Sequence, residues 1–497
     1  MKLSDNKIII FTFCLLLTGL GSCKKFLATY SQNRSFVETV DDLDEILVGE
    51  GYFTGPAPHF QYVMDDDITM GRPAGVFTVL YYSGFYNWQP DPWIDNEGKV
   101  TSTDNYFNKL YKNISRLNVV LLNVPLLRAK GEPEEKLQKV SGEAHYLRAY
   151  FYFMLLNLYG KPWQSSTAAI DFGVPLKTDS PVEDKFFTRS TVKQVYDQIL
   201  ADLYVAEKEL ETFNTTTPKR ANAAAVQGLL SRVLLYQGEY EKSISYSDKL
   251  IGNKRYKLND LNNYTAGSDF NTLSSPETIF TMGSPDVPNL MYISMDMPVS
   301  EFYQVSDDLG NQYSHEDLRL NAFYFRNSEG NLRCVKTHNQ YLAASDVSDC
   351  WLIRLSELYL NRAEALAMLG RDQEAINTIQ ELRKARFKPA DLTTISYTGE
   401  TLVNFIRDER RRELAFESHR WFDLRRYAVS SRYSYGKSIR HQSYTYGPSG
   451  FVKDGYYELN NYNQDKAAWI VPIARDEIEF NNGNLQNEDR PQRPLKH

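Results

Sequence analysis

Residues 408–427 read Asp-Glu-Arg-Arg-Arg-Glu-Leu-Ala-Phe-Glu-Ser-His-Arg-Trp-Phe-Asp-Leu-Arg-Arg-Tyr, and this stretch decides the fold. It is dense in both signs of charge, yet it also holds bulky apolar residues. If it forms one helix that begins near residue 402, side chains three and four positions apart share a face. That face holds Leu402, Phe405, Ile406, Arg410, Glu413, Leu414 and Glu417. Charged groups therefore interrupt an apolar stripe.

The charges inside the stripe predict ion pairs in the interior of the protein. A surface helix keeps its charged side chains opposite its apolar face. Buried charges are normally paired, so we expect guanidinium groups to meet carboxylates from neighbouring helices. The predicted ion-pair clasp consists of Arg410, Arg412, Glu413, Glu417 and Arg420. A catalytic carboxylate or an anion-binding site is the alternative interpretation.

The same stretch carries a family resemblance. Arg-Arg-Glu-Leu-Ala-Phe-Glu at 411–417, followed by Arg-Trp-Phe-Asp-Leu-Arg-Arg at 420–426, resembles the C-terminal signature of the SusD/RagB family. The helical run at 143–160 and the closing motif that begins Trp-Ile-Val-Pro-Ile at 469–473 resemble the same family. The likeness runs from Cys23 to the C-terminus.

The resemblance implies a mainly α, SusD-like fold and a non-catalytic binding protein. Members of this family are outer-membrane lipoproteins that capture nutrients at the cell surface and partner a TonB-dependent, SusC-like transporter. We therefore expect a protein that binds oligosaccharide or polysaccharide and delivers it to such a transporter. A peptide-capturing member of the family, a glycoside hydrolase and a pure assembly scaffold are the alternatives. A hydrolase needs two carboxylates about 5–9.5 Å apart in a cleft, and no loop motif singles out such a pair.

Composition limits the partners of this chain of 497 residues. Its net charge of -7 argues against a nucleic-acid partner, because nucleic-acid binders normally carry a basic surface. Its 34 tyrosines offer flat apolar rings with hydroxyl groups, which suit a polar ring-shaped ligand and suit an ordinary core equally.

Residues 1–22 have the pattern of a lipoprotein signal peptide. Lys2 and Lys7 precede an apolar run at 8–20, which is shorter than the roughly 20 residues of a membrane-spanning helix. The run ends Leu-Gly-Ser-Cys, so we expect acylation, as with palmitate, at Cys23 and attachment to the membrane through that lipid. A plain secreted protein with a chance cysteine is the alternative. The family resemblance implies the outer membrane and its external face.

Helical periodicity predicts helices over 40–47, 106–127, 133–159 and 191–210. Two further stretches, 221–251 and 351–385, have small residues at equal offsets around a glycine turn, which is the spacing of tetratricopeptide-type hairpins. These small residues are Ser231 and Ser243 around Gly238, and Ala363 and Ala375 around Gly370. The hairpins predict an α superhelix that serves as a rigid scaffold.

Long irregular segments separate the predicted helices. Residues 253–349 are rich in Asn, Asp, Ser, Gly and Tyr, and we expect inserted loops with short strands there. Residues 433–466 are similarly irregular and rich in tyrosine. We divide the mature chain into an N-terminal region with helical hairpins at 23–250 and a C-terminal region at 251–497 that holds the inserted loops and the charged helix.

Aromatic clusters in these loops are the candidate ligand site, because functional residues concentrate in loops on a rigid frame. A sugar presents an apolar C–H face and a ring of hydroxyls, so it suits an aromatic ring beside an Asn, Asp or Arg. The resemblance implies that Trp88 and Arg72 face the sugar. The predicted ligand-binding residues are Arg72, Tyr86, Trp88, Asp91, Trp93, Tyr292 and Tyr313. The alternative is that these rings pack the loops against the helices.

The sequence contains no zinc motif, and we expect no cofactor. Asp65, Asp66 and Asp67 lack the alternating ligand positions and glycine turn of a calcium loop, so we expect a solvated or capping role, with calcium as the alternative. Cys334 and Cys350 form a disulfide or remain buried thiols, and their spacing does not decide between the two.

Overall fold

The computed structural model describes most of residues 37–497. The residues in this range that it does not describe are 56–57, 59, 72–81, 95–97, 101, 103–104, 181–184, 214, 216, 286, 292–302, 328–329, 338–345 and 449. The predicted signal peptide and Cys23 lie outside the described residues, as do Arg72 and Tyr292 of the predicted ligand site.

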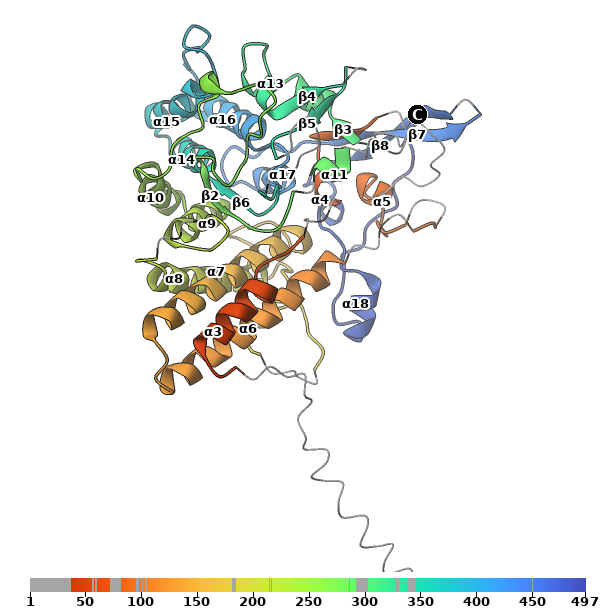
Figure 1. Ribbon diagram of the computed structural model, residues 1–497. Helices are drawn as coiled ribbons and strands as arrows, with labels where there is room; N and C mark the ends of the chain where they lie inside the picture. Colours follow the sequence, from red (N-terminus) through yellow and green to blue (C-terminus); the bar gives the residue numbers. More distant parts are fainter. Residues whose placement is uncertain are drawn as a thin grey trace, which may run out of the picture.

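Helices at the N-terminal end match the sequence periodicity closely. Asn105 caps α6 by accepting a hydrogen bond from the Asn108 amide, and Thr191 forms a capping box at the start of α8. The helix α7 ends at Gly160, as the sequence predicts. The bounds are α3 (Val40–Ile46), with a π-helical turn at Leu47–Gly51, α6 (Tyr106–Ala129), α7 (Glu134–Tyr159) and α8 (Val192–Glu209). These helices pack beside one another at the lower end of Figure 1.

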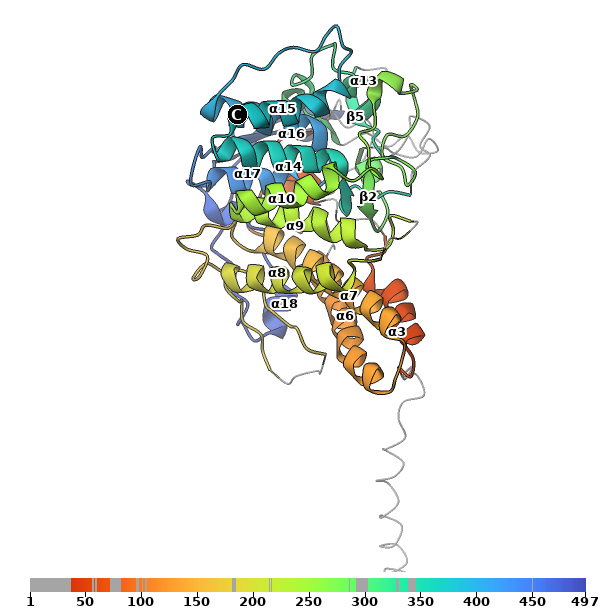
Figure 2. The same ribbon diagram turned by 90° about the vertical axis from the view of Figure 1, so that its left-hand side faces the viewer.

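The two predicted hairpins stack into one helical layer, which Figure 2 shows from α9 up to α15. The helices are α9 (Ala223–Gln237), α10 (Tyr240–Ile251), α14 (Leu355–Met368) and α15 (Asp372–Lys384). Ser231 and Ser247 lie 2.8 Å apart, Oγ to Oγ, so α9 and α10 approach closely. Gly238 and Gly370 turn with φ of 77° and 78°, a conformation that favours glycine. The tetratricopeptide-type scaffold is thereby confirmed.

The charged stretch forms two helices, so the prediction of one continuous helix is wrong. Helix α16 (Gly399–Leu414) ends before Ala415, and α17 (Arg420–Ala428) begins after five intervening residues, 415–419. Phe416 and Ser418 have positive φ of 61° and 63° at the break, which costs about 1–2 kcal/mol per residue. The break turns the Glu417 carboxylate towards two buried cations, and these ion pairs hold the strained backbone in place.

The strands form four antiparallel pairs among the described residues: β1 (Ile68–Met70) with β3 (Tyr303–Val305), β2 (Thr278–Thr281) with β6 (Leu352–Arg354), β4 (Tyr324–Arg326) with β5 (Leu332–Cys334), and β7 (Ile439–Gly447) with β8 (Gly450–Leu459). Segment 253–349 holds short strands, as expected. Segment 433–466 is not irregular, because β7 and β8 make a long hairpin. In Figure 1 this hairpin lies on the side of the molecule away from α10 and α15.

Short helices connect the strands and complete the fold. They are α4 (Phe60–Val63), α5 (Ser83–Tyr86), α11 (Val287–Met291), α12 (Asp307–Gly310), α13 (Arg319–Phe323) and α18 (Arg475–Phe480), with 3-10 turns at Leu261–Asn263 and Lys466–Trp469. Among the described helices, none has both the length and the apolar character that a membrane crossing requires. Cys334 and Cys350 are buried free thiols.

The close approach of α14 and α15 yields a first prediction. Ala375 is fully buried on α15, so Ala375→Leu should overpack the hairpin and lower the free energy of unfolding by about 1–3 kcal/mol. Asn377→Leu, two positions along on the exposed side of α15, is the control and should change stability by less than about 0.5 kcal/mol. Urea denaturation measures both, and equal stabilities of the two variants would contradict the packing.

Candidate binding site

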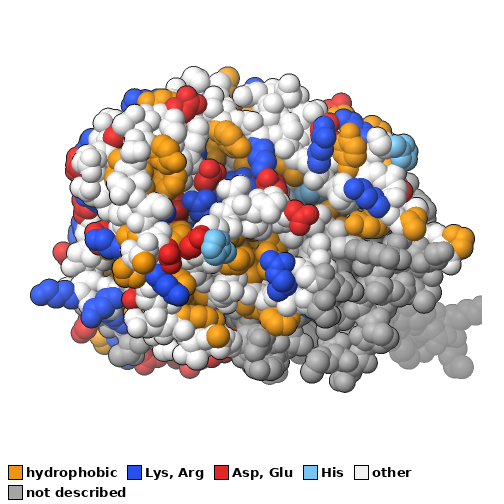
Figure 3. Space-filling view, turned by 90° about the horizontal axis from the view of Figure 1, so that it is seen from above, with side chains coloured by type: hydrophobic (Ala, Val, Ile, Leu, Met, Phe, Trp, Pro, Cys, Tyr) orange, Lys and Arg blue, Asp and Glu red, His pale blue; other side chains and the backbone are white. Residues whose placement is uncertain are grey.

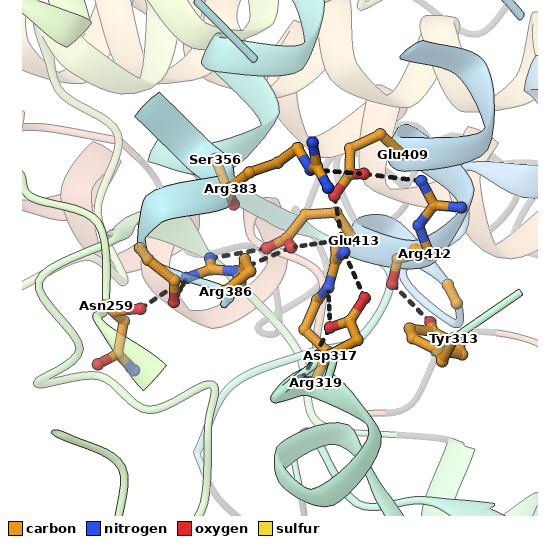
Figure 4. A network of polar contacts seen from close by, with 12 residues as sticks. Asn259, Tyr313, Asp317, Arg319, Ser356, Arg383, Arg386, Glu409, Arg412 and Glu413 are labelled. Atoms are coloured by element: carbon orange, nitrogen blue, oxygen red, sulfur yellow. Dashed lines mark hydrogen bonds and ion pairs between the residues drawn. The ribbon is translucent and has the colours of Figure 1, made fainter. Parts of the chain in front are cut away.

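Glu413 of α16 lies at the centre of a buried group of charged side chains (Figure 4). Its side chain is 0% exposed, and three guanidinium groups surround it. Arg354 donates to Oε1 at 2.7 Å, Arg386 donates to both oxygens at 2.8 and 2.9 Å, and Arg319 donates to Oε2 at 3.1 Å. Glu277 joins the same group by accepting from Arg354 at 3.0 Å and Arg386 at 2.7 Å. We call these five residues the Glu413 cluster.

The other residues of the predicted clasp also form ion pairs. Glu417 accepts from Arg354 and from Lys336, each at 2.8 Å. Arg410 pairs with Asp423 of α17 at 2.8 Å, and Arg412 pairs with Glu409 at 2.7 Å. Arg420 binds both oxygens of Asp66 at 2.7 Å. The Arg412–Glu409 pair lies within α16, whereas the other contacts join the charged stretch to another part of the chain or α16 to α17.

The pairing keeps these buried carboxylates ionised. Burial by itself would raise the pKa of Glu413, but the guanidinium groups of Arg386 and Arg354 hold that pKa well below its usual range. Burial is likewise outweighed at Glu409, where Arg319 and Arg412 lower the pKa to about 2. A carboxylate that is buried and ionised in this way cannot reach a substrate or serve as a general acid near neutral pH. The arrangement is structural.

Asp65, Asp66 and Asp67 connect the charged helices to the strands. All three are buried, so the solvated role in the expected solvated or capping role is wrong, whereas Asp65 does cap the local backbone by accepting from the Asp67 amide at 2.9 Å. Asp66 pairs with Arg420, and Asp67 accepts from Arg411 Nε at 2.7 Å, because α16 and α17 present their cations to this segment. The donor oxygens of the three aspartates lie within 4.8 Å of one another, a spacing that could hold a metal ion. In this structure Arg411 and Arg420 supply positive charge beside them.

The acidic segment also positions the short strand β3 and the helix α12. Ser306, the N-cap of α12, donates through Oγ to the Asp66 carbonyl at 2.6 Å and through its amide to the Asp67 carbonyl at 2.8 Å. Lys437, just before β7, pairs with Asp66 at 2.5 Å and with Asp308 of α12 at 2.6 Å. The charged helices therefore hold β3 and α12 in place through Asp66.

Trp88 and Tyr86 belong to the interior and are not surface rings. Trp88 is 1% exposed, and its indole Nε1 donates to the Met64 carbonyl at 2.9 Å. Tyr86 is 0% exposed, and its hydroxyl accepts from the Met70 amide at 2.9 Å. His441 of β7 stacks on both rings, at 4.1 Å from Tyr86 and 4.3 Å from Trp88. Their role as ligand contacts is corrected: they pack the loops against β7.

Tyr313 is buried as well, at 7% exposure. Its hydroxyl donates to the Arg412 carbonyl at 2.7 Å and lies 2.9 Å from the Tyr324 hydroxyl. Trp93 is half-buried and packs edge-on against Phe85, with ring centroids 5.6 Å apart. Asp91 is exposed. Of the described residues in the predicted ligand set, Asp91 and Trp93 alone retain substantial access to solvent.

A polar cleft of about 350 Å³ lies between β3, α12 and the β4–β5 hairpin. The polar side chains that line it are those of Gln304, Ser306, Asp307, Asn311, Tyr313, His315, Arg326 and Asn331. Seen from above, this end of the molecule shows apolar, acidic and basic side chains intermixed (Figure 3). The mixture of amides with one acid, one arginine and one histidine suits a ligand rich in hydroxyl groups, because amides both donate and accept hydrogen bonds.

A second recess of about 620 Å³ adjoins the polar cleft, since Ser306 and Asp307 line both. Lys437, Arg440 and Glu458 line its other side. Sequence reasoning placed Tyr313 near this region but missed Gln304, Asn311 and Asn331. The only signal was the Asn-rich and Asp-rich composition of 253–349, which does not tell a cleft residue from a turn residue.

Two family models match the chain. Residues 289–489 match the model of the SusD family, and residues 73–235 match a model described as starch-binding and associating with the outer membrane. SusD-like protein P38 of Formosa agariphila is 25% identical, over 85% of this chain and 92% of that protein. SusD-like protein P2 of the same organism is 24% identical, over 79% of this chain and 81% of that protein.

Solved structures have the same fold. A SusD superfamily protein from Bacteroides thetaiotaomicron superposes with a TM-score of 0.71 at 22% identity, covering 91% of this chain and 100% of that one. A SusD-like carbohydrate binding protein from Bacteroides vulgatus gives a TM-score of 0.65 at 20% identity, covering 90% of this chain and 97% of that one. These likenesses confirm the predicted SusD-like fold.

The Glu413 cluster predicts a large effect from a small change. Glu413→Gln leaves the shape but removes the charge that faces three buried guanidinium groups, so we expect a loss of about 3–5 kcal/mol in unfolding free energy. Glu400→Gln, at the exposed start of the same helix, is the matched control and should cost under about 1 kcal/mol. Chemical denaturation of both variants measures the difference. Similar values for the two would show that Glu413 is not the centre of the fold.

The lowered pKa values predict acid sensitivity. Glu409 has an ordinary pKa of 4.5 and a folded pKa of about 2, so its contribution to stability is complete above about pH 4.5 and is lost as the pH falls towards 2. Glu413 acts in the same direction. Burial raises the pKa of some other carboxyl groups, which therefore oppose this trend; they are Asp65, Asp67, Glu143, Glu209 and Asp408.

We therefore expect the melting temperature to be nearly constant from about pH 7 to about pH 5 and to fall steeply below about pH 4.5. Scanning calorimetry at constant ionic strength measures the profile. A melting temperature that stays level or rises between about pH 4.5 and about pH 2.5 would contradict the paired state of these carboxylates.

Proposed function

Because the chain belongs to the SusD/RagB family, we propose that it binds oligosaccharide or polysaccharide in the polar cleft without cleaving it. The observation that carries the proposal is the lining of the cleft, where the amide side chains of Gln304, Asn311 and Asn331 accompany Asp307 and Arg326. A sugar ring offers hydroxyls that both donate and accept, and such a lining can satisfy both kinds of group.

Affinity in this cleft comes from several weak contacts. A hydrogen bond exchanged with water contributes only about 0.5–1.5 kcal/mol net, and association itself has an entropic cost. Several sugar residues are needed for useful binding, and the adjoining recess at Lys437 and Arg440 extends the surface beyond one ring. A chain of sugars therefore fits better than a free monosaccharide.

The arrangement of carboxylates favours binding over hydrolysis. Among the described carboxylates that line the cleft and its adjoining recess, Asp66, Asp308 and Glu458 are each paired with cations, and only Asp307 has no ion pair. A glycoside hydrolase needs two carboxyl groups that flank the scissile bond, one as the proton donor and one as the base or nucleophile, so Asp307 by itself does not meet this requirement. In the peptide-capturing alternative, the same cleft would bind peptides. Binding assays with peptides and with polysaccharides distinguish the two functions.

We propose that the protein works at the outer membrane, anchored by a lipid on Cys23, and passes its ligand to a SusC-like TonB-dependent transporter. Support comes from the Leu-Gly-Ser-Cys end of the leader and from the description of the second matching family model, which names association with the outer membrane. The orientation towards the cell exterior and the transporter partner rest on the family relationship.

The double variant Gln304→Ala with Asn331→Ala tests the polar cleft. We expect at least about tenfold weaker retention on affinity gels that contain soluble starch, xylan or laminarin, because two hydrogen-bonding amides are removed. Asn377→Ala, on the exposed side of α15, is the control and should migrate like the parent protein.

The same polysaccharides are then incubated with the parent protein and assayed for reducing ends. Retention without release of reducing ends supports a non-catalytic binder, whereas release would make the protein a hydrolase. Equal retention of the double variant and the parent protein would show that polysaccharide does not bind in this cleft. Binding of peptides in place of all the polysaccharides would favour the peptide-capturing alternative.

A further inference from the structure

A separate recess of about 200 Å³ lies where the first hairpin meets the charged helices. The turn between α9 and α10, the loop after α7 and the end of α17 form its walls, and it shares no lining residue with the polar cleft. Tyr236, Tyr427 and Arg407 line it together with serines from two loops.

Arg407 of α16 stands apart from the other buried arginines of this helix. It is 4% exposed, and its Nη1 donates to the Tyr433 carbonyl at 2.7 Å and more weakly to Asn404 at 3.4 Å. Its Nε is buried and donates to nothing in the described part of the chain. No carboxylate among the described residues pairs with Arg407, whereas Arg410 and Arg411 both have carboxylate partners.

Two guanidinium groups lie over the ring of Tyr427, with that of Arg407 at 4.3 Å from the ring centroid and that of Arg426 at 4.4 Å. Arg426 is neutralised, because Glu364 accepts from both of its terminal nitrogens and Asp423 accepts from its Nε. Arg407 is therefore the cation in this recess that lacks an anion. A buried guanidinium without a counter-ion is costly, and an anionic ligand would remove that cost.

Hydroxyl groups surround the position that an anion would take. Ser165, Ser166, Ser430 and Ser431 line the recess from two loops, and the first two and the last are exposed at its mouth. Tyr240, at the start of α10, and the half-buried Trp163 complete the wall. A planar guanidinium suits a carboxylate, and the hydroxyls and rings suit the body of a sugar.

We propose that this recess is a subsite for one acidic sugar residue, whose carboxylate pairs with Arg407. The inference rests on the proposed function for the class of ligand, a carbohydrate, but it concerns a different place on the molecule. It gives the protein a second contact, on the side of the helical scaffold, that selects polysaccharides containing uronic acid. A sulfated sugar offers an anion of similar charge, so the test compares the two.

The experiment uses the full mature protein and isothermal titration calorimetry with D-glucuronate, D-glucose and D-galactose 6-sulfate as probes. We expect glucuronate to bind at least tenfold more tightly than glucose. Arg407→Gln should weaken glucuronate binding by at least tenfold, and Arg432→Gln, at a neighbouring exposed arginine, should leave it unchanged. Tighter binding of the sulfated sugar than of glucuronate would overturn the carboxylate assignment.

A second variant covers the case in which Arg407→Gln unfolds. Ser431→Trp alters an exposed residue at the mouth and should block glucuronate by filling the recess without removing a buried contact. Glucuronate binding that survives Ser431→Trp, or equal affinity for glucuronate and glucose, would overturn the proposal.

The Gln304→Ala with Asn331→Ala variant separates the two sites. It should bind glucuronate as tightly as the parent protein, even where polysaccharide retention is lost. Loss of glucuronate binding in this variant would place the anion in the polar cleft and refute the subsite at Arg407. Failure of glucuronate to bind the parent protein would also refute the subsite, and polysaccharide retention would still stand as the test of the polar cleft.

Discussion

The pairing of the Glu413 carboxylate with three buried guanidinium groups is the interaction on which the rest of the structure depends. Arg319, Arg354 and Arg386 come from α13, from the end of β6 and from the segment after α15, so a single carboxylate gathers three distant parts of the chain. Charge burial is expensive, and a well-packed apolar core of equal volume can be as stable. We infer that the cluster specifies which segments meet, since Glu413 is the carboxylate that all three of these arginines share.

Ion pairs from the charged helices also fix the position of the polar cleft. Arg411 and Arg420 hold Asp67 and Asp66, the backbone of these aspartates fixes Ser306, and Ser306 starts the short helix beside the cleft. The helices α16 and α17 thus position the loops beside β3 and α12, which carry the polar side chains of the cleft. Arg407 departs from this pattern on α16, because its guanidinium lines a recess and has no carboxylate partner among the described residues.

The sequence predicted the long helices and the hairpins because their periodicity and small residues are local properties. Buried charge on α16 was also predictable, since Arg410 and Glu413 fall within an apolar stripe. The break after Leu414 was not predictable from the sequence. Phe416 and Ser418 have positive φ there, and the ion pairs of Glu417 that accompany this backbone are made with Lys336 and Arg354, which are distant in sequence. Trp88 and Tyr86 could not be told from surface rings, because their burial depends on His441, more than 350 residues along the chain.

Native-state hydrogen exchange tests most directly whether the ion network joins the scaffold to the cleft. The amides of α16 and those of Ser306 and its neighbours in β3 and α12 should exchange as one cooperative unit, with similar free energies of opening. Under Glu413→Gln both should lose protection together. Rapid exchange in β3 and α12 beside full protection in α16 would contradict the account, because the cleft would then be held independently of the buried charges.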